Sequence, residues 1–397
     1  MATKKDSTNV ATVNQNKEKA VKNALAAMQK KYGKETINVY GDSGNTIDVI
    51  HEPTGSIAFD YITGGGLARG RVHEFYGPEG SGKTSVALQA VAEMQKKGGV
   101  AAFIDVEHAL DPKQAARLGV DVNSLILSQP TYAEQALDIM EDLINSNVVD
   151  IIILDSVAAL VPKAELEGSM EDNQVGLIAR VMGKALRKIT GAASKTGTIV
   201  VFINQVRDAV GVMYGNPEVT PGGKALKFYC SIRIRVSKGK QIVDKKTKQP
   251  IGQHVFLKCK KNKVGMPYLD AETDFYFLHG MDAAYDIATY GAQFDVIGKK
   301  GRTYILPNGE PIMYKGEPVT NKDALAEALH DRSTGLIDVF YKPTLEAMDA
   351  YTRTALEETQ DDEEDEDTDD LDDLMGALDG DEETTTDAPD MDDEDLD

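Results

Sequence analysis

The sequence predicts an α/β protein with a mostly parallel central sheet, an N-terminal helix and a small α+β C-terminal domain. Apolar runs alternate with helical patterns between residues 72 and 203, and such alternation produces a parallel sheet covered by helices. A glycine-rich motif at residues 77–84 joins the first apolar run to the first of these helices. Beyond residue 224, strand patterns follow one another without intervening helices, which indicates an antiparallel edge.

The expected elements can be followed along the chain. Helical patterns cover residues 85–97, 112–118, 132–144 and 175–190, and strand patterns cover residues 72–76, 100–106, 125–127, 148–154, 198–203, 231–236, 254–260 and 274–277. Ahead of them, residues 14–31 predict a helix with a narrow apolar stripe from Ala20 to Met28. A stripe this small predicts packing against something outside the segment, and a neighbouring subunit is one candidate.

The net charge of −22 belongs to one end of the chain. Residues 361–397 hold 22 acidic residues and no lysine or arginine, so the remainder carries equal numbers of acidic and basic residues. Such a block is expected to be disordered, and it serves either as a solubilising tail or as an electrostatic decoy for a polyanion. Leu371, Leu374, Met375 and Leu378 share a helical spacing that would suit a short docking helix.

Cysteine usage and hydropathy set the expected compartment. The two cysteines, Cys230 and Cys259, supply no disulfide framework, and no run approaches the length of a membrane span. Because the first residues also lack the apolar core of a secretion signal, we expect a cytoplasmic protein.

The motif at residues 77–84 predicts a nucleotide site. It reads G-x-x-x-x-G-K-T between a strand and a helix, the context in which backbone N–H groups and a helix N-terminus bind phosphates. Lys83 would reach the terminal phosphates of ATP and Thr84 would hold Mg²⁺. The expected nucleotide-binding residues here are Gly77, Pro78, Glu79, Gly80, Ser81, Gly82, Lys83, Thr84 and Ser85.

Three further strands end in polar residues at the edge where parallel sheets bind ligands. Asp155 ends an apolar strand and would anchor Mg²⁺ beside Thr84. Glu107 follows another strand and would orient the attacking water, the alternative being a surface acid. Gln205 ends the strand 198–203 and would sense the terminal phosphate, the alternative being a structural amide. A long glycine-containing loop at residues 207–223 follows it.

Basic residues concentrate between Arg233 and Lys263. This stretch of 31 residues carries a net charge of +10, as expected of a surface that meets phosphate backbones. A solvated hairpin is the alternative for residues 245–248. Lys261 and Lys263 share one face of a strand, which favours a phosphate partner for both.

Taken together, these segments resemble the bacterial RecA family over residues 14–357. The resemblance is carried by residues 77–84, 103–112, 154–168, 202–207, 211–217 and 222–228. It implies a DNA-dependent ATPase that forms a helical filament on single-stranded DNA, catalyses homologous pairing and strand exchange with duplex DNA, and acts in recombination, repair and the SOS response. A ring-forming helicase on the same core is the alternative, and a scaffold that promotes self-cleavage of a repressor is a possible additional role. Single-strand-binding or loading proteins are further expected partners.

The resemblance also implies roles for individual residues. Two DNA-facing loops are expected near residues 167–176 and 207–223. Lys261 and Lys263 match lysines that reach a neighbour's ATP across the filament interface, an assignment we prefer to direct DNA contact. Phe228 matches an aromatic residue at the subunit contact, and Asp111 and Gln114 belong to the nucleotide site. The residues expected to bind DNA are Val175, Arg180, Arg187, Arg207, Val210, Gly222 and Gly223.

The chain departs from the family pattern in three places. Gln114 stands where the family usually stacks an aromatic ring on adenine, Asp208-Ala209 follows Arg207 where a cation is common, and the acidic tail is long.

The expected domain division is an oligomerisation helix and linker at residues 1–45, an ATPase core with DNA-binding loops at 46–281, a small C-terminal domain at 282–357 and the tail at 358–397.

Overall fold

The computed structural model describes residues 5–33, 37, 49–169, 176–208, 218–244 and 246–364. The chain divides into two compact units, Met1–Ile50 and His51–Asp397. The first unit contains helix α1 (Lys5–Tyr32), which begins earlier than the predicted Asn14 and ends where the sequence indicates. Val21 and Met28 of its apolar stripe are 52% and 45% exposed. None of the described helices combines the length and apolarity that crossing a bilayer requires.

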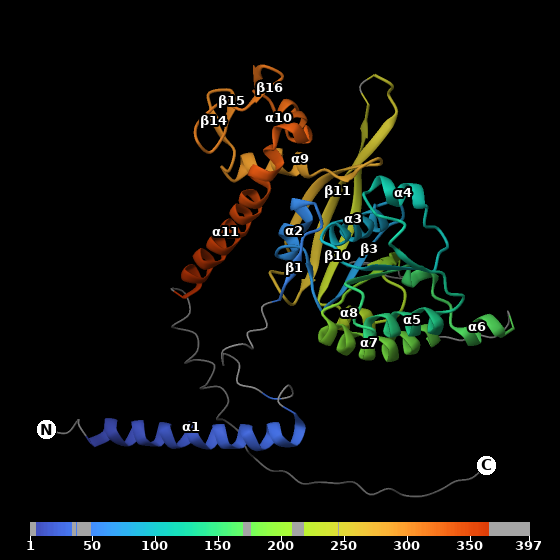
Figure 1. The fold of residues 1–397 in the computed structure, drawn as a ribbon, viewed down its shortest axis with the longest axis vertical. Helices are drawn as coiled ribbons and strands as arrows, with labels where there is room; N and C mark the ends of the chain where they lie inside the picture. Colours follow the sequence, from blue (N-terminus) through green and yellow to red (C-terminus); the bar gives the residue numbers. More distant parts are fainter. Residues whose placement is uncertain are drawn as a thin grey trace, which may run out of the picture. The chain divides into compact units, whose positions relative to one another are not determined.

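A large mixed sheet forms the centre of the second unit (Figure 1). Its order within the described residues is β13-β12-β11-β10-β3-β7-β6-β4-β5. The bounds are β3 (Val72–Gly77), β4 (Ala101–Asp105), β5 (Ile126–Ser128), β6 (Ile151–Asp155), β7 (Ile199–Gln205), β10 (Ile232–Val243), β11 (Pro250–Asn262), β12 (Asp270–Tyr276) and β13 (Gly280–Met281). Strands β10 to β13 pair antiparallel and the remaining pairs are parallel, as the change of pattern after residue 224 predicts.

The parallel strands bring their carboxyl ends to one edge of the sheet. Gly77 of β3 is in register with Gln205 of β7, and Asp105 of β4 is in register with Asp155 of β6. These four residues come from segments that are far apart in the chain. The register therefore assembles the polar strand ends that the sequence singles out.

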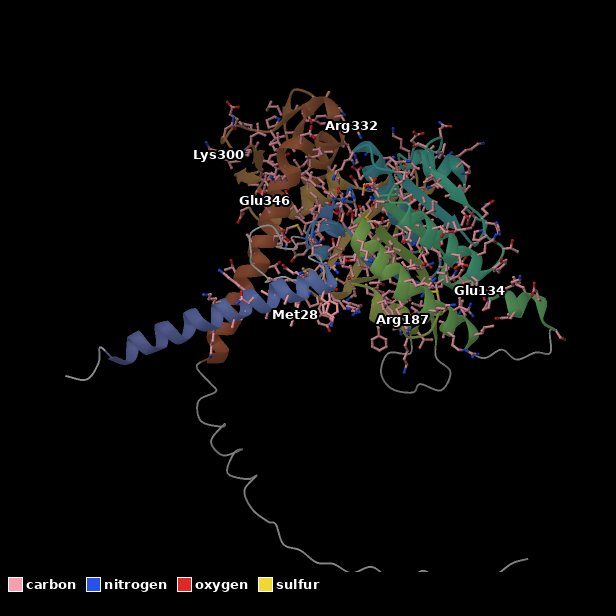
Figure 2. The ribbon with its side chains drawn as sticks, turned by 60° about the horizontal axis from the view of Figure 1, so that its bottom comes forward. Met28, Glu134, Arg187, Lys300, Arg332 and Glu346 are labelled. Carbon is pink, nitrogen blue, oxygen red and sulfur yellow. The ribbon has the colours of Figure 1, made fainter. Side chains whose placement is uncertain are left out.

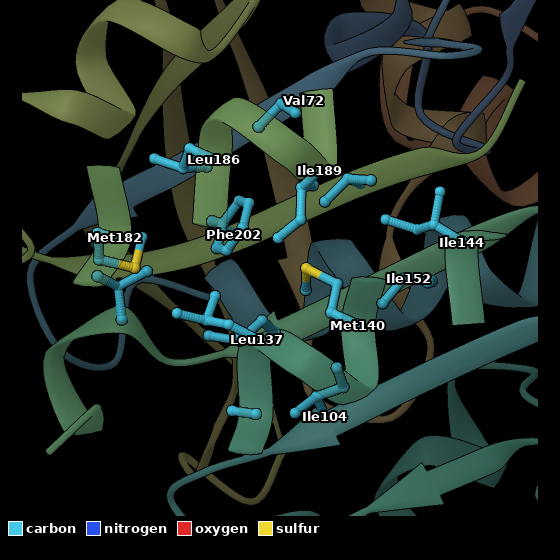
Figure 3. Close-up of a cluster of buried hydrophobic side chains, with 14 of the residues drawn as sticks. Val72, Ile104, Leu137, Met140, Ile144, Ile152, Met182, Leu186, Ile189 and Phe202 are labelled. Atoms are coloured by element: carbon cyan, nitrogen blue, oxygen red, sulfur yellow. The ribbon is translucent and has the colours of Figure 1, made fainter. Parts of the chain in front are cut away.

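Helices cover both faces of the sheet. The helices of this part of the chain are α2 (Ile57–Thr63), α3 (Lys83–Lys96), α4 (Pro112–Arg117), α5 (Ala133–Asn145), α6 (Lys163–Glu167), α7 (Leu177–Thr196) and α8 (Ala225–Tyr229), with a 3₁₀ turn at Val157–Ala159. Helix α6 has no buried residue. The helices α5, α7 and α8 lie together beside one face (Figure 1). Leu137, Met140, Leu186 and Ile189 project from α5 and α7 into the buried cluster drawn in Figure 3, against Phe202 and other residues at alternate positions of the strands.

The opposite face carries α2 and α3. The Phe59 ring of α2 meets the Phe75 ring of β3 edge to face, with 5.2 Å between centroids. Successive residues of a strand point to opposite faces, so Phe75 belongs to this layer, whereas Val72 belongs to the cluster with α7. This alternation places β3 in the middle of the core, with all six residues buried.

The C-terminal part, from α9 onward, packs against α2 through polar groups. Tyr341 donates a 2.6 Å hydrogen bond to the buried Asp60 of α2, and Ser56 donates a 2.9 Å bond to the buried Asp286. The elements are α9 (Ala283–Asp286), a π-helical turn (Ile287–Gly291), β14 (Gly298–Lys300), β15 (Thr303–Ile305), β16 (Met313–Tyr314), β17 (Glu317–Pro318), α10 (Lys322–His330), a 3₁₀ turn (Arg332–Thr334) and α11 (Leu336–Glu364).

Several bounds differ from the sequence prediction. β10 and β11 extend well beyond the predicted 231–236 and 254–260 and form a long hairpin that projects past the neighbouring strands (Figure 1). Its outer part is polar and solvated, so it lacks the hydrophobic pattern from which strands are predicted. Helix α11 continues to Glu364, past the expected domain end at residue 357. Two short ladders, β1 (His51–Glu52) with β2 (Leu67–Ala68) and β8 (Arg207–Asp208) with β9 (Glu218–Val219), were not expected.

Candidate functional site

A cavity of about 320 Å³ lies at the carboxyl edge of the parallel strands. Most of the nucleotide-site residues expected from the sequence line it. They are Glu79, Gly80, Gly82, Lys83, Thr84, Ser85, Glu107, Gln114, Asp155 and Gln205. Gly77, Pro78, Ser81 and Asp111 do not line this cavity.

The loop between β3 and α3 has the close approaches that require glycine. A Cβ on Gly77 would lie 1.9 Å from the carbonyl oxygen of Val236, so a larger residue would force the strands apart. The ammonium of Lys83 donates to the carbonyl oxygens of Gly77 (3.0 Å) and Pro78 (2.7 Å). Burial lowers the pKa of Lys83. Ser81 is buried, and its hydroxyl has no hydrogen-bond partner among the described residues.

Thr84 and Asp155 meet at the base of the cavity. The Thr84 hydroxyl donates a 2.6 Å hydrogen bond to Oδ2 of Asp155. Burial raises the pKa of Asp155 to about 6, and the nearby Glu107 carboxylate adds to this, while the Thr84 hydroxyl and Lys83 oppose it. A hydroxyl paired with a carboxylate is the kind of hard oxygen pair that Mg²⁺ prefers.

Glu107 and Gln205 also meet in the cavity. One oxygen of Glu107 accepts hydrogen bonds from the hydroxyl of Ser156 and, at 3.2 Å, from Nε2 of Gln205. Asp105 fixes the turn that carries Glu107, because its two oxygens accept from the backbone N–H groups of Ala109 and Leu110. A carboxylate held in this way can orient a water molecule and accept its proton.

The far side of the cavity is built by Gln253, Phe275 and Phe277 of the antiparallel edge, which no sequence motif indicated. Ser156 and Ile203, from segments that the sequence singles out, also line the cavity. Gln114 reaches across to this edge and donates a 3.0 Å hydrogen bond to the carbonyl oxygen of Phe277. Asp111 caps α4 by accepting from the backbone N–H of Lys113. The two phenylalanines belong to an ordinary strand pattern, so only the sheet order reveals their proximity to the motif at residues 77–84.

Lys261 and Lys263 lie away from this cavity. Lys261 pairs with Arg233, which pairs in turn with Glu74 near the start of β3, whereas the cavity begins beyond the other end of that strand. Both ammonium groups donate to the carbonyl oxygen of Phe228 at the end of α8. The Phe228 side chain is 68% exposed. The two lysines and this aromatic residue therefore form one surface, which is separate from the cavity of their own subunit.

The described part of the expected DNA surface involves α7 and the ends of the loop at residues 207–223. Arg180 and Arg187 are exposed and seven residues apart, so they share one side of α7; Arg187 is labelled in Figure 2. Arg207 is also exposed. Gly222 and Gly223 have φ values of +86° and +79°, and their Cβ positions would lie 2.7 Å from Val157 and 2.6 Å from Ala179. Val175 and Val210 lie outside the described residues.

Comparisons with known proteins show the family to which the chain belongs. The family profile described as RecA N-terminal domain matches residues 19–282. The chain is 51% identical to Protein RecA of Symbiobacterium thermophilum, over 72% of this chain and 83% of that one. It is 47% identical to Protein RecA of Thermus aquaticus, over 87% of this chain and 98% of that one. A crystal structure of the RadB recombinase is similar over 58% of this chain and 98% of its own, at 22% identity and a TM-score of 0.46.

The expectations for fold and activity are thereby confirmed. The cavity joins the phosphate-binding motif to a carboxylate and an amide from neighbouring strands, and the relatives match nearly the whole length of the chain outside its tail. The chain belongs to the RecA family and is a DNA-dependent ATPase of homologous recombination and repair.

Proposed function

We propose that ATP binds in the cavity beside residues 77–84 and that its hydrolysis controls a filament on single-stranded DNA. The observation that carries this proposal is the meeting of Lys83, Thr84, Glu107, Asp155 and Gln205 in one cavity. Lys83 now bonds to carbonyl groups of its own loop, and it would exchange them for phosphate oxygens. Ser81 offers a buried hydroxyl without a partner in the described residues, a further sign that the loop is built for a ligand.

The residues present fit a magnesium ion. Thr84 and Asp155 would hold it, since their oxygens already lie 2.6 Å apart. When bound, Mg²⁺ neutralises charge that develops on the phosphate oxygens. In the remaining chemistry, Glu107 would orient the attacking water and take up its proton. Ser156 and Gln205 fix this carboxylate, and Gln205 would exchange its bond to Glu107 for one to the terminal phosphate.

Lys261 and Lys263 would complete the site of a neighbouring subunit. They are absent from the lining of their own cavity, and they lie beside the exposed Phe228. Cations donated across an interface stabilise the charge of the transition state only after assembly, which would make hydrolysis depend on the filament. The contact that joins Lys261 to a neighbour's cavity uses different surfaces on the two subunits, and such a contact generates an open helix when its rotation does not close into a ring.

DNA would bind along the side of the core that carries α7 and the ends of the loop at residues 207–223. Arg180, Arg187 and Arg207 would meet phosphates, because all three are exposed. Because Gly222 and Gly223 have no side chains, they would let the protein backbone come close to the DNA strand. Val175 and Val210 would insert between groups of bases, as the resemblance implies.

Partners and domain roles complete the proposal. Duplex DNA, single-strand-binding or loading proteins and a self-cleaving repressor are candidate partners of the filament, and the acidic tail would compete with duplex DNA for basic surface.

We keep the division of the chain into domains that end at residues 45, 281 and 357, with residues 1–45 as the segment that docks on the next subunit. We also propose a cytoplasmic location, in agreement with two buried cysteines that form no disulfide.

A mixing experiment tests the shared site. Lys83→Ala removes the phosphate-binding lysine and leaves Lys261 intact, whereas Lys261→Ala does the reverse. Each variant alone should lose hydrolysis stimulated by single-stranded DNA. In an equimolar mixture, about a quarter of the interfaces would join an intact loop to an intact lysine, so about a quarter of the activity should return.

The same mixture distinguishes the alternatives. Activity of the Lys261→Ala variant equal to that of the unchanged protein would mean that each subunit hydrolyses ATP by itself. Failure of the mixture to recover activity, although both variants bind DNA and each other, would overturn the assignment of Lys261 to a neighbour's site. Lys258→Ala is a matched control, because Lys258 lies on the same strand and pairs with Asp270.

A further inference from the structure

Glu74 is a carboxylate in the centre of the core. It lies on β3, three residues before the phosphate-binding loop begins, and its side chain is fully buried. Its two oxygens bond to different segments: Oε1 accepts from Nδ2 of Asn204, at 3.0 Å, and Oε2 accepts from Nε of Arg233, at 2.5 Å. A buried ion pair is weak evidence for stability, because desolvation offsets its attraction. The presence of Glu74 therefore calls for a reason other than stability.

Asn204 joins Glu74 to the residue proposed as the phosphate sensor. Its Oδ1 accepts a 3.0 Å hydrogen bond from the backbone N–H of Gln205. Its Nδ2 donates to Glu74 and also, at 3.1 Å, to the carbonyl oxygen of Pro221. Pro221 lies directly before Gly222 and Gly223, at the C-terminal end of the loop at residues 207–223. One amide group therefore contacts both the sensor and the end of this loop.

The end of the loop is fixed at two more points. Arg233 lies over the Tyr76 ring, with 3.9 Å from its guanidinium carbon to the ring centroid, and donates a 3.4 Å hydrogen bond to the hydroxyl of Thr220. Arg235 donates two hydrogen bonds to Glu218, at 2.8 and 2.5 Å. Residues 218–221 are thus attached to β7 by the side chain of Asn204 and to β10 by those of Arg233 and Arg235.

We propose that Asn204 and Glu74 are positioning residues that transmit the state of Gln205 to the end of the loop at residues 207–223. When the Gln205 side chain exchanges its bond to Glu107 for one to a phosphate oxygen, the Gln205 backbone moves and displaces the side-chain amide of Asn204. This amide is hydrogen-bonded to the Pro221 carbonyl and to the Glu74 carboxylate, so both groups move with it. Glu74 passes the shift through Arg233 to Thr220. Nucleotide binding thereby sets the position of Gly222 and Gly223, and with it the affinity for DNA.

This inference rests on the proposed roles of Gln205 as sensor and of the loop as a DNA-binding segment. Its test is the ratio of two dissociation constants for single-stranded DNA in the full-length protein, one measured with ADP and one with a non-hydrolysable ATP analogue. Asn204→Asp keeps the acceptor for the Gln205 N–H and removes the donor to Glu74 and Pro221. Glu74→Gln keeps the shape and removes the charge that pairs with Arg233.

A third variant acts from the surface and avoids the core. Glu218→Gln weakens the two-bond pair with Arg235, and the Glu218 side chain is 20% exposed. Glu141→Gln is its matched control, because Glu141 also pairs with a cation, Lys188, and is 22% exposed, but lies on α5 away from the loop. Should one core variant fail to fold, the other still tests the relay, while Glu218→Gln and its control test whether the attachment of the loop end matters for the coupling.

The expected result is a loss of coupling without a loss of nucleotide binding. Asn204→Asp and Glu74→Gln should reduce the ratio by about tenfold, within the usual range for coupled sites, and Glu218→Gln by about threefold. The affinity for the ATP analogue without DNA should change by less than about threefold, and Glu141→Gln should match the unchanged protein.

Two results would overturn the inference, and they are distinguishable. A lower melting temperature with an unchanged ratio in the three variants would make these residues structural supports only. A ratio near one in the unchanged protein would remove the nucleotide sensing that the proposed function assigns to Gln205, and this inference with it.

Discussion

The hydroxyl of Thr84 and the carboxylate of Asp155 lie 2.6 Å apart, although 70 residues separate them in the chain. If both hold Mg²⁺, Thr84→Val should raise the Mg²⁺ concentration that gives half-maximal ATP hydrolysis by about 10- to 100-fold. Thr84→Ser keeps the hydroxyl and should change it little. A titration of hydrolysis against Mg²⁺ measures this, and equal curves for the two variants would contradict it.

Glu107 is expected to act in the chemical step and to contribute little to nucleotide binding. Glu107→Gln should lower kcat by about 10²- to 10⁴-fold, the usual effect of losing a general base, with little change in the affinity for ATP. Ser156→Ala removes only a group that orients Glu107, so its loss should be about tenfold. Single-turnover hydrolysis on single-stranded DNA gives both values. A large loss of ATP affinity in Glu107→Gln would argue for a binding role instead.

The resemblance to the family implies that an aromatic ring usually stands at the position of Gln114. Its amide bonds to the Phe277 carbonyl across the cavity. Gln114→Tyr would supply a ring that stacks on adenine, so we expect affinity for ADP to rise by about 2- to 10-fold, as stacking contributes about 0.5–1.5 kcal/mol. Calorimetric titration with ADP measures this. An unchanged or weaker affinity would indicate that the bond between Gln114 and Phe277 already shapes the base site.

Tyr341 ties the C-terminal part to the core through Asp60. Its hydroxyl donates a 2.6 Å bond to this fully buried carboxylate. Tyr341→Phe leaves that oxygen without this donor, and we expect a loss of about 1–3 kcal/mol in the free energy of unfolding. Tyr351→Phe, at a 64% exposed position of the same helix, should be neutral. Denaturant unfolding compares them, and equal midpoints would show that the bond contributes nothing measurable.

Asp286 predicts a dependence of stability on pH. Burial raises its pKa from 3.8 to about 7, despite hydrogen bonds from Thr273, Ala58 and Ser56. The folded protein therefore holds the proton more tightly than the unfolded chain does. Stability from this group is fully present below about pH 4 and is lost as the pH rises through about 7.

Asp286→Asn removes this titration. Between pH 4 and pH 7.5, the unchanged protein should lose stability relative to the variant by an amount on the order of 4 kcal/mol at most. Urea unfolding at several pH values measures the two slopes. Parallel curves would mean that Asp286 does not change protonation on folding. Asp60, whose pKa burial raises to about 6, contributes to both curves alike.

The nucleotide site could be predicted in part. The motif at residues 77–84, Asp155, Glu107 and Gln205 follow apolar strands, and parallel strands present such ends at one edge. Gln253, Phe275 and Phe277 could not be predicted, because their strands carry ordinary alternating patterns. Only the pairing of β10 with β3 and of β11 with β12 brings that edge to the cavity.

The surface around Lys261 is another feature that could be predicted only in part. Sequence alone allowed either DNA contact or a neighbour's nucleotide as its partner. In the sheet register, Lys261 lies opposite Arg233, and Arg233 lies opposite Glu74 on its other side, so Lys261 is set away from its own cavity and beside Phe228. The register of an antiparallel pair depends on how two long strands align, and the polar outer part of this hairpin gives no pattern that fixes it.

The sequence by itself determined the α/β class, the succession of core strands along the chain and the phosphate-binding motif, because these depend on local periodicity and on residues adjacent in the chain. Only the tertiary structure decided which side chains meet: Thr84 with Asp155, Glu107 with Ser156, and Asn204 with Glu74. The physical reason is that a polar residue in an apolar strand carries no local sign of its partner. Burial and register choose that partner when the sheet assembles.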